Sequence, residues 1–484
     1  MEELLKLLNS DPTKVIAQIR TTTKDNSTIK NYIKEYVELD RNQREGQIDR
    51  VQIDKALPAG QTSKMVKIYI NHAQNIVETL SAFIIGRPVS LIASVDNNLS
   101  VLVKQLWRIN RLDSKLLEAT RIKLAETQVA VNFYINDIST TSILNKVLVK
   151  LGLKTQAKEI KVKVLNNTSG TMTPYFDGNG DMLLFMWEYQ TIENSKTINH
   201  VQIWDAKNYH YLNDVAGKMM YADSVKLHGF DRIPIAYDAQ LEPQWYAVKT
   251  PADRHEVAMS KLGDANDYSG HPILVTIGEV KNMPLKQESG KHFNIPITID
   301  DEGKEVKGDV KFLEATTAPE ANKLEIDKLE DIIAYGSGVP NLSFEKLKSL
   351  GNVAEKTVKL MFLGTELKAE MKRSETRTFI ERCINILISG ITTTTNTALA
   401  KEGESLYYDI HFNSILPSDL GEKVDIVSKA VTSGTMSKRT DIGWLDVVED
   451  VDGEMADIMQ EKAAESTTDV NKEQTVKEII PEVK

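Results

Sequence analysis

The residues best placed to bind an ion lie between Asp177 and Glu188. Asp177, Asn179, Asp181 and Glu188 put oxygen-bearing side chains at positions 1, 3, 5 and 12 of a calcium-binding loop. Such a loop needs a glycine at position 6, but Met182 stands there, and the sequence on both sides is strand-like. Asp-Gly and Asn-Gly pairs also form the commonest tight turns between antiparallel strands. The segment therefore predicts a β-hairpin rather than a metal site.

A second cluster, Asp253 to Glu256, combines two carboxylates with an arginine and a histidine. These residue types could perform acid–base chemistry. The same types are common in the solvated first turn of a helix, where carboxylates complement the helix dipole. We expect a surface or a subunit interface at this position.

No further motif supports catalysis. The eight histidines form no H-x-x-x-H or H-E-x-x-H pair, and the single cysteine, Cys383, allows neither a disulfide nor a cysteine zinc site. The sequence has no G-x-x-x-x-G-K-S/T phosphate loop and no G-x-S-x-G turn, and Gly178-Asn179-Gly180 lacks the third glycine of a dinucleotide loop. We therefore expect no enzyme, no cofactor and no metal.

Composition limits the class of protein. At 484 residues and 54.3 kDa, the chain is long enough for two or three domains with their own cores. No apolar stretch is long enough to span a membrane, and Met1 to Lys6 shows no signal-peptide pattern. The net charge is −10, and Asp441 to Lys484 carries thirteen Asp and Glu against four Lys. We expect the acidic segment 463–484 to be disordered and the chain to bind nucleic acid weakly.

Sequence periodicity predicts an α+β protein. Apolar spacing predicts a helix over 64–85 and two helical runs over 97–127, and the first 66 residues also have helical character. Short runs rich in β-branched and aromatic residues predict antiparallel strands at Val129–Ile135, Ile160–Leu165, Met182–Tyr189, His200–Ile203 and Tyr209–Leu212.

Two further helices, 250–268 and 319–335, flank a strand-rich module of about 45 residues. If they pack antiparallel, the module is a small domain carried at the end of a helical pair. The second helix should stop at Gly336-Ser337-Gly338-Val339-Pro340, because glycine tolerates a positive φ and proline cannot continue the helix. After a polar segment, one helix of about 35 residues is expected from Asn352 to Ser389.

Three stretches of this chain carry recognisable motifs. One is Gly336-Ser337-Gly338-Val339-Pro340-Asn341, followed by Gly351-Asn352-Val353-Ala354-Glu355-Lys356. Another runs from Ile68 to Leu80 and on to Ile85-Gly86-Arg87-Pro88-Val89. The third is Ile410-His411-Phe412-Asn413 with Leu416-Pro417-Ser418-Asp419 and Gly434-Thr435-Met436-Ser437. Together, over about residues 65–460, they resemble the portal proteins of tailed bacteriophages of the SPP1 type.

The resemblance implies an α+β, portal-like fold with long stem and strut helices, an antiparallel β-rich wing and a small α/β clip module. The expected regions are an N-terminal helical region (1–66), the wing (67–249), the first stem helix (250–269), the clip (270–318), the second stem helix (319–336), the tunnel loop (337–351), the long helix of wing and crown (352–390), the crown (391–462) and the acidic tail (463–484).

The resemblance also implies a function without catalysis. About twelve copies would form a ring at one capsid vertex, and double-stranded DNA would pass through its channel during packaging and ejection. Terminase and head–tail connector proteins would dock on the ring, which would sit among major capsid and scaffold proteins. It would assemble in the cytoplasm of a bacterial host and reside in the virion. The alternative is an adaptor or baseplate component that does not contact DNA.

Two lysines of the expected tunnel loop, Lys346 and Lys348, are candidates for contact with DNA. A ring of subunits would turn each into a ring of positive charge that attracts phosphate without reading sequence. An ordinary solvated loop is the alternative.

The expected second stem helix has more acids than lysines. If one of its faces lines a channel, this surplus would repel phosphate and ease the sliding of a duplex. The candidate channel-lining residues are Glu325, Lys328, Glu330 and Asp331. A solvated helix face is again the alternative.

Overall fold

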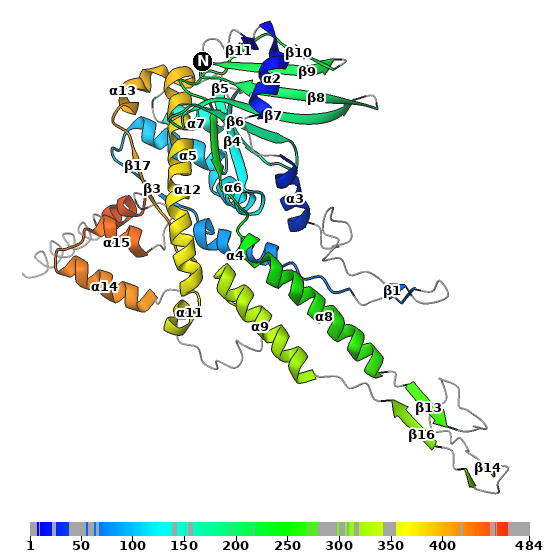
Figure 1. Cartoon of the computed structure of the whole chain (residues 1–484). Helices are drawn as coiled ribbons and strands as arrows, with labels where there is room; N and C mark the ends of the chain where they lie inside the picture. The colour runs from blue at the N-terminus through cyan, green and yellow to red at the C-terminus, as the bar shows by residue number, and fades with distance from the viewer. Residues whose placement is uncertain are drawn as a thin grey trace, which may run out of the picture.

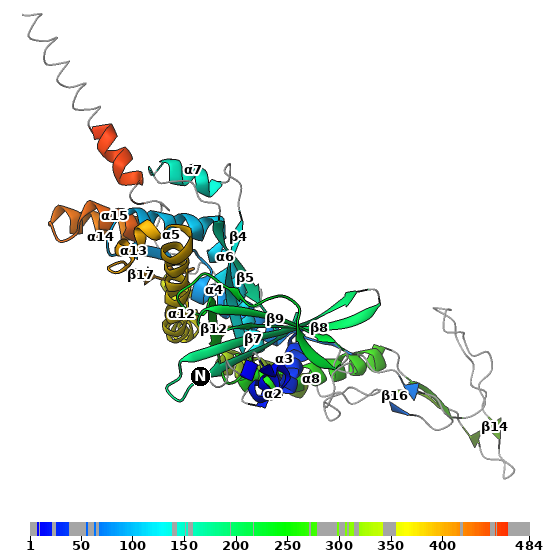
Figure 2. The same ribbon diagram turned by 90° about the horizontal axis from the view of Figure 1, so that it is seen from above.

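A body of sheets and helices, with a pair of helices projecting from it, makes up the chain (Figure 1). The pair still projects when the molecule is seen from above (Figure 2). The computed structural model describes residues 7–8, 10–21, 26–37, 55–56, 62–63, 67–137, 143–150, 152, 158–193, 195–215, 217–270, 273–277, 298–299, 305–306, 309–313, 319–341, 355–416, 420–445, 451 and 453–462. Among these residues, no helix combines the length and the apolar character needed to cross a membrane.

The strands are all antiparallel. Their bounds are β1 (Lys55–Ala56), β2 (Thr62–Ser63), β3 (Ser90–Ala93), β4 (Gln128–Asp137), β5 (Lys158–Leu165), β6 (Thr171–Phe176), β7 (Met182–Glu193), β8 (Lys196–Trp204), β9 (Asn208–Val215), β10 (Lys218–Tyr221), β11 (Lys226–Leu227), β12 (Ile235–Ala239), β13 (Ile273–Ile277), β14 (Thr298–Ile299), β15 (Glu305–Val306), β16 (Asp309–Leu313) and β17 (Tyr408–His411). One sheet has the order β12-β4-β5, and a larger one has the order β10-β9-β8-β7-β6, with β11 also paired to β9.

The helices pack around the smaller sheet and extend from it. Their bounds are α2 (Pro12–Thr21), α3 (Asn26–Val37), α4 (His72–Ile85), α5 (Asn98–Ile109), α6 (Leu112–Glu126), α7 (Ile143–Lys150), α8 (Lys249–Gly270), α9 (Pro319–Ser337), α11 (Glu355–Met361), α12 (Leu363–Gly390), α13 (Ala400–Gly403), α14 (Leu420–Thr432) and α15 (Lys438–Leu445), with short turns η3 (Tyr246–Val248), η4 (Ile391–Thr395) and η5 (Thr397–Leu399). The predicted α+β class is confirmed.

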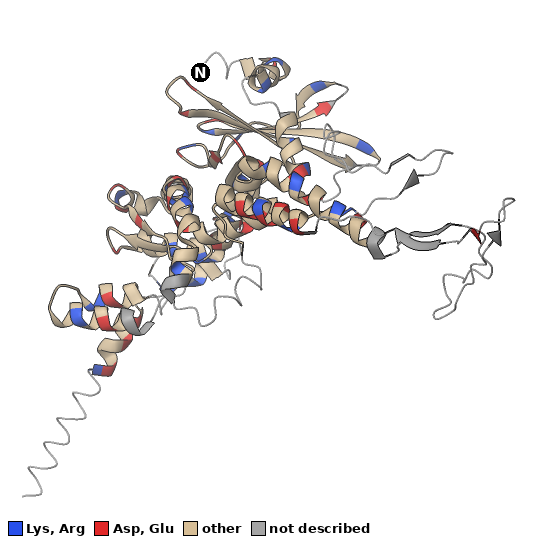
Figure 3. Cartoon of the chain, turned by 60° about the horizontal axis from the view of Figure 1, so that its bottom comes forward, with Lys and Arg blue, Asp and Glu red and all other residues tan. Residues whose placement is uncertain are grey.

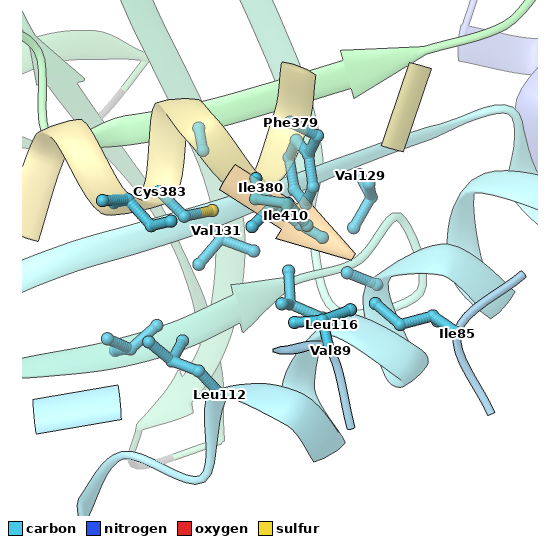
Figure 4. Packing of buried hydrophobic residues seen from close by; sticks show 14 of the residues in the cluster. Ile85, Val89, Leu112, Leu116, Val129, Val131, Phe379, Ile380, Cys383 and Ile410 are labelled. Carbon is cyan, nitrogen blue, oxygen red and sulfur yellow. The ribbon is translucent and has the colours of Figure 1, made fainter. Parts of the chain in front are cut away.

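The main core lies where α12 crosses the three-stranded sheet. Phe379, Ile380 and Cys383 of α12 pack in one buried cluster with Val131 of β4 and Leu116 of α6 (Figure 4). Burial raises the pKa of the Cys383 thiol far above its usual range, so this lone cysteine stays protonated in the core.

The hairpin predicted at Asp177 is confirmed. β6 ends at Phe176 and β7 begins at Met182, and the two strands pair. Asp177 Oδ1 accepts the backbone N–H groups of Asn179 and Asp181, each at 2.9 Å, and Gly180 adopts a φ of 90°. The Asp177 carboxylate is therefore committed to closing the turn.

The predicted helix 64–85 begins later than expected, at His72. Asn71 caps it by accepting the backbone N–H of Gln74 at 3.0 Å. The preceding residues 67–71 are not helical, because their backbone is held by α8 instead: Ile68 N–H donates to Ser260 Oγ at 2.9 Å. A contact between segments so distant in sequence leaves no trace in local periodicity.

The single long helix predicted over 352–389 is two helices in the structure. α11 ends at Met361 and α12 begins at Leu363, with Phe362 between them. The Phe362 ring packs on Phe83 of α4 at a centroid distance of 5.2 Å, and Gly364 is the second residue of α12. A tertiary contact beside a weak helix former accounts for the break.

Both described N-terminal helices pack on their own chain. α2 lies on the larger sheet, where Ile16 and Ile19 join a buried cluster with Ile203. α3 lies beside the start of α8, where Lys249 forms an ion pair with Glu35.

Two of the stretches that carry the family resemblance lie side by side. β17 pairs with β3, and Asn413 Nδ2 donates to Pro88 O at 2.8 Å.

Candidate functional site

The projecting pair consists of α8 and α9, packed antiparallel along their length (Figure 1). Arg254 near the start of α8 forms an ion pair with Glu325 of α9, with Nη2 at 2.5 Å from Oε1. Near the base of the pair, a Cβ on Gly336 would lie 2.7 Å from Val248, which fits the close approach of the two backbones. At the far end β13 pairs with β16, so the chain leaves and re-enters the pair at neighbouring points.

The four residues predicted to line a channel do not share one face of α9. Lys328 and Asp331 lie on the exposed face, where they form an ion pair at 3.5 Å with most of each side chain in solvent. Glu325 instead faces α8 through Arg254. Glu330 faces the base of the pair, where its Oε2 accepts Asn341 Nδ2 at 2.6 Å.

Acids exceed lysines on α9, five to two. Figure 3 shows acidic and basic positions interleaved along the projecting helices. An i,i+3 ion pair in solvent contributes only about 0.2–0.5 kcal/mol, so the Lys328–Asp331 pair adds little to the stability of α9.

The base of the pair contains a buried polar cluster. The sequence predicts a solvated turn at 253–256, which is wrong for Asp253, His255 and Glu256: all three are buried and only Arg254 is exposed. Glu256 Oε1 accepts the Ile70 N–H at 3.1 Å, so the carboxylate completes the backbone bonding of segment 67–71.

His255 lies at the centre of this cluster. Its Nδ1 is 2.9 Å from Nε2 of His72, and its Nε2 is 3.9 Å from Oε1 of Glu330. Burial lowers the pKa of His255, partly offset by the nearby carboxylates of Glu330 and Glu256. We therefore take His255 as neutral at pH 7.

The turn after α9 is fastened to α12. Gly338 adopts a φ of 72°, in the left-handed region that favours glycine. Its carbonyl accepts Thr365 Oγ1 at 2.7 Å, and the Gly336 carbonyl accepts Lys368 Nζ at 2.7 Å. Burial lowers the pKa of Lys368. With Val339 also buried, the start of the following loop is held in place.

Residues 342–354 follow this fastened turn in the sequence and precede α11. Lys346 and Lys348 lie in residues 342–354, outside the residues that the structure describes. The described residues on either side of this segment are Asn341, bound to Glu330, and Glu355, the first residue of α11.

α8 and α9 form a two-helix projection, and the turn at its base is anchored on α12. The sequence matches the family described as phage portal protein, SPP1 Gp6-like, over residues 14–468. The chain belongs to this family. The resemblance seen in the three sequence stretches is thereby confirmed, and the family is a structural, non-enzymatic one.

Solved structures similar to this portal protein come from gene transfer agent (GTA) particles. They are titled the neck of the empty GTA particle computed with C6 symmetry (13% identity, TM-score 0.40), the neck of the native GTA particle computed with C12 symmetry (12%, 0.36) and the virion of the native gene transfer agent particle (12%, 0.37); each covers 78% of this chain and 89% of the other. A comparison with curated proteins finds no match. The family assignment therefore rests on the sequence match.

Sequence reasoning missed the residues that anchor the loop of this portal protein. Thr365 and Lys368 are three apart on α12, so they share a helix face. That spacing is too common to single them out. The sequence feature that points to this turn is Gly338, since a glycine after a helix predicts a left-handed cap.

Substitution of Gly338 by alanine should destabilise the portal protein. A left-handed alanine costs about 1–2 kcal/mol, and the new Cβ would lie 2.7 Å from Lys368 Cδ, which must move. Gly180→Ala is the matched control, because Gly180 has a φ of 90° with no atom near its Cβ position. We expect a larger fall in melting temperature for Gly338→Ala by calorimetry. Equal falls would mean that the Lys368 contact contributes nothing.

Stability should fall in mild acid because of His255. Its folded pKa lies below the unfolded value of about 6.5, so the unfolded chain takes up the proton first as the pH falls. The contribution is fully present above about pH 6.5 and is lost as the pH falls from there toward the folded pKa. The melting temperature of His255→Gln should therefore depend less on pH. His228, half-buried and also with a pKa lowered by desolvation, is unchanged in both proteins, so the comparison isolates His255.

Proposed function

We propose that this portal protein forms a closed ring of about twelve copies at one vertex of a phage capsid, and that double-stranded DNA passes through the ring during packaging and ejection. Family membership supports the proposal. The subunit would act by shape and charge, without making or breaking a bond.

The observation that carries the proposal is a pair of exposed apolar stripes on different elements. On α11 and α12, Leu360, Leu363, Leu367 and Met371 follow helical spacing, with exposed fractions of 69%, 50%, 61% and 76%. On α9, Leu324 and Tyr335 are 59% and 92% exposed. Neither stripe is covered by the described part of its own chain.

Two different stripes suit a head-to-tail contact. Such an interface uses unlike surfaces on successive copies and closes into a ring when the rotation between them allows it. Exposed apolar patches on a folded chain commonly mark protein contacts, since burial of apolar area stabilises association. We propose that the stripe on α11 and α12 of one copy packs against a neighbouring copy.

The parts of the subunit then take distinct roles. α8 and α9 would form the stem, with a clip (270–318) at its end that docks terminase and later the head–tail connector. Lys328 and Asp331 share the exposed face of α9 with Leu324 and Tyr335, so they would lie at the edge of that subunit contact, next to the channel. Glu325 and Glu330 serve contacts within the subunit. The anchored turn would fix the start of a tunnel loop that presents Lys346 and Lys348 to DNA. We further propose that the remaining parts of the subunit form the wing and the crown (391–462). The ring would sit among capsid and scaffold proteins and would assemble in the bacterial cytoplasm.

Native mass measurement and negative-stain imaging of the purified chain test the ring. We expect annular particles of about 650 kDa, twelve times 54.3 kDa, with a hole wide enough for a duplex. A chain that stays monomeric or dimeric even when it is co-expressed with its scaffold and capsid proteins would contradict the proposal and favour an adaptor that does not contact DNA.

A further inference from the structure

One part of this acidic chain is strongly basic. Residues 98–165 contain twelve Lys and Arg against five Asp and Glu, although the whole chain carries a net charge of −10. Such asymmetry within one chain indicates a surface for an anionic partner. The segment covers α5, α6, β4, α7 and β5.

The basic side chains repeat with the period of each element. Lys104 and Arg108 are four apart on α5, as are Lys146 and Lys150 on α7, so each pair lies on one helix face. Lys161 and Lys163 are two apart on β5 and point to one face of the sheet.

Tertiary contacts bring α5, α7 and the Ile160 face of β5 together, whereas Lys161 and Lys163 point to the opposite face of that strand. Asn110 Nδ2, at the turn between α5 and α6, donates to Ile160 O of β5 at 3.0 Å, and Lys115 Nζ donates to Val162 O of the same strand. Leu106, Leu144 and Ile160 line one small cavity, so α5, α7 and β5 meet there. Figure 2 shows these elements together on the side of the body away from the stem.

Few acids neutralise this surface. Lys161 pairs with Glu159, but no ion pair with a described residue involves the other exposed basic side chains. These are Arg108, Arg111, Arg121, Lys146, Lys150, Lys158 and Lys163, and Lys104 is half-buried. Arg111 also holds a left-handed conformation, with φ 52° and ψ 49°, which costs about 1 kcal/mol for a residue with a Cβ. The Arg111 side chain is exposed at the turn that joins α5 to α6.

We propose that the basic surface formed by α5, the α5–α6 turn and α7 binds the phosphate backbone of duplex DNA outside the channel. Spread-out lysines and arginines without a deep pocket suit a continuous polyanion and read no sequence. An anionic membrane is the weaker partner, because exposed apolar side chains in this region are largely confined to α7, at Ile143 and Val149.

Binding of a short mixed-sequence duplex, followed by fluorescence anisotropy over a range of salt concentrations, tests this surface. The variant Lys104→Gln, Arg108→Gln, Lys146→Gln, Lys150→Gln removes four positive charges, three from exposed positions and one, Lys104, from a half-buried position. Each lost phosphate contact lowers the slope of log K against log salt by about 0.9, so we expect the slope to fall by about 3 to 4 and the affinity by about tenfold or more.

A matched variant controls for net charge. Lys30→Gln, Lys196→Gln, Lys207→Gln, Lys218→Gln removes the same charge from exposed positions on α3 and the larger sheet. It should change the affinity by less than about twofold. Far-UV circular dichroism of both variants checks that they fold.

Three results would overturn the inference: equal losses in both variants, no loss in the first, or loss only in Lys346→Gln with Lys348→Gln. Binding that is found with vesicles of phosphatidylserine and phosphatidylcholine but not with the duplex would assign the surface to membranes instead. The measurement needs no closed ring, so its failure is distinguishable from a failure of the proposed ring.

Discussion

A chain carrying Leu367→Asp and Met371→Asp is expected to remain a single subunit of 54.3 kDa under conditions where the parent chain assembles into a ring. Both side chains are more than half exposed on α12, so aspartate there disturbs no buried contact of the subunit. In a ring, each copy would bury two carboxylates against apolar surface, at a cost of several kcal/mol per interface. Because every interface of a closed ring is the same, this cost recurs at each one. Native mass spectrometry reads the outcome directly.

The control variant places aspartates on the wing instead. Ile192 and Leu241 are each 79% exposed and lie outside both stripes. Ile192→Asp with Leu241→Asp should assemble like the parent chain. If the α12 variant still forms rings, the stripe on α11 and α12 is not the subunit interface, and the ring must close through other surfaces.

Local sequence pattern predicted the elements that depend on local forces. The apolar spacing of Leu102, Val103, Leu106 and Trp107 predicted the buried face of α5, and all four are buried. The Asp-Gly and Asn-Gly pairs predicted the hairpin at Asp177 for the same reason, because turn chemistry is set by a few neighbouring residues.

Errors arose where a distant segment overrides the local pattern. Ile68 fits the apolar stripe of a helix, yet its N–H is bound by Ser260, almost two hundred residues away. His255 and Glu256 look like solvated residues at a helix start, but segment 67–71 covers them. Glu325 and Lys328 belong to one acidic helix, but Glu325 contacts α8 and Lys328 is exposed to solvent. Only the position of α8 makes this difference.

The family resemblance predicted the regions of the chain but not the individual tertiary contacts between them. The resemblance assigned the stem and the loop through loose motifs in a fixed order, and the match over residues 14–468 confirms the family. The resemblance could not indicate that Thr365 and Lys368 hold the turn after α9. Both side chains donate to backbone carbonyls, and every residue has a carbonyl, so the sequence does not mark the acceptors.

Arg373→Met should destabilise the contact between α12 and α4 more than any surface change. The Arg373 side chain is buried, its Nη1 lies 2.8 Å from carboxylates of both Glu366 and Glu370, and its Nη2 donates to Phe83 O at 2.7 Å. Methionine fills a similar volume but leaves the half-buried Glu366 and the Phe83 carbonyl without a partner. Removing one member of a buried ion pair costs about 3–5 kcal/mol. Amide exchange in α4 and α12 should therefore speed up by about a hundredfold or more.

Two further variants show whether unpaired charge causes this loss. Arg382→Met, on the exposed side of the same helix, loses one hydrogen bond to Tyr237 O and should cost about 1 kcal/mol or less. Adding Glu366→Gln to Arg373→Met should restore part of the lost protection, because a neutral amide is cheaper to leave buried than a carboxylate. If the double variant exchanges as fast as Arg373→Met, packing of the arginine stem rather than its charge holds α12 to α4. The anchored turn at Gly338 is bound to that same helix through Thr365 and Lys368, so its position depends on the α12–α4 contact.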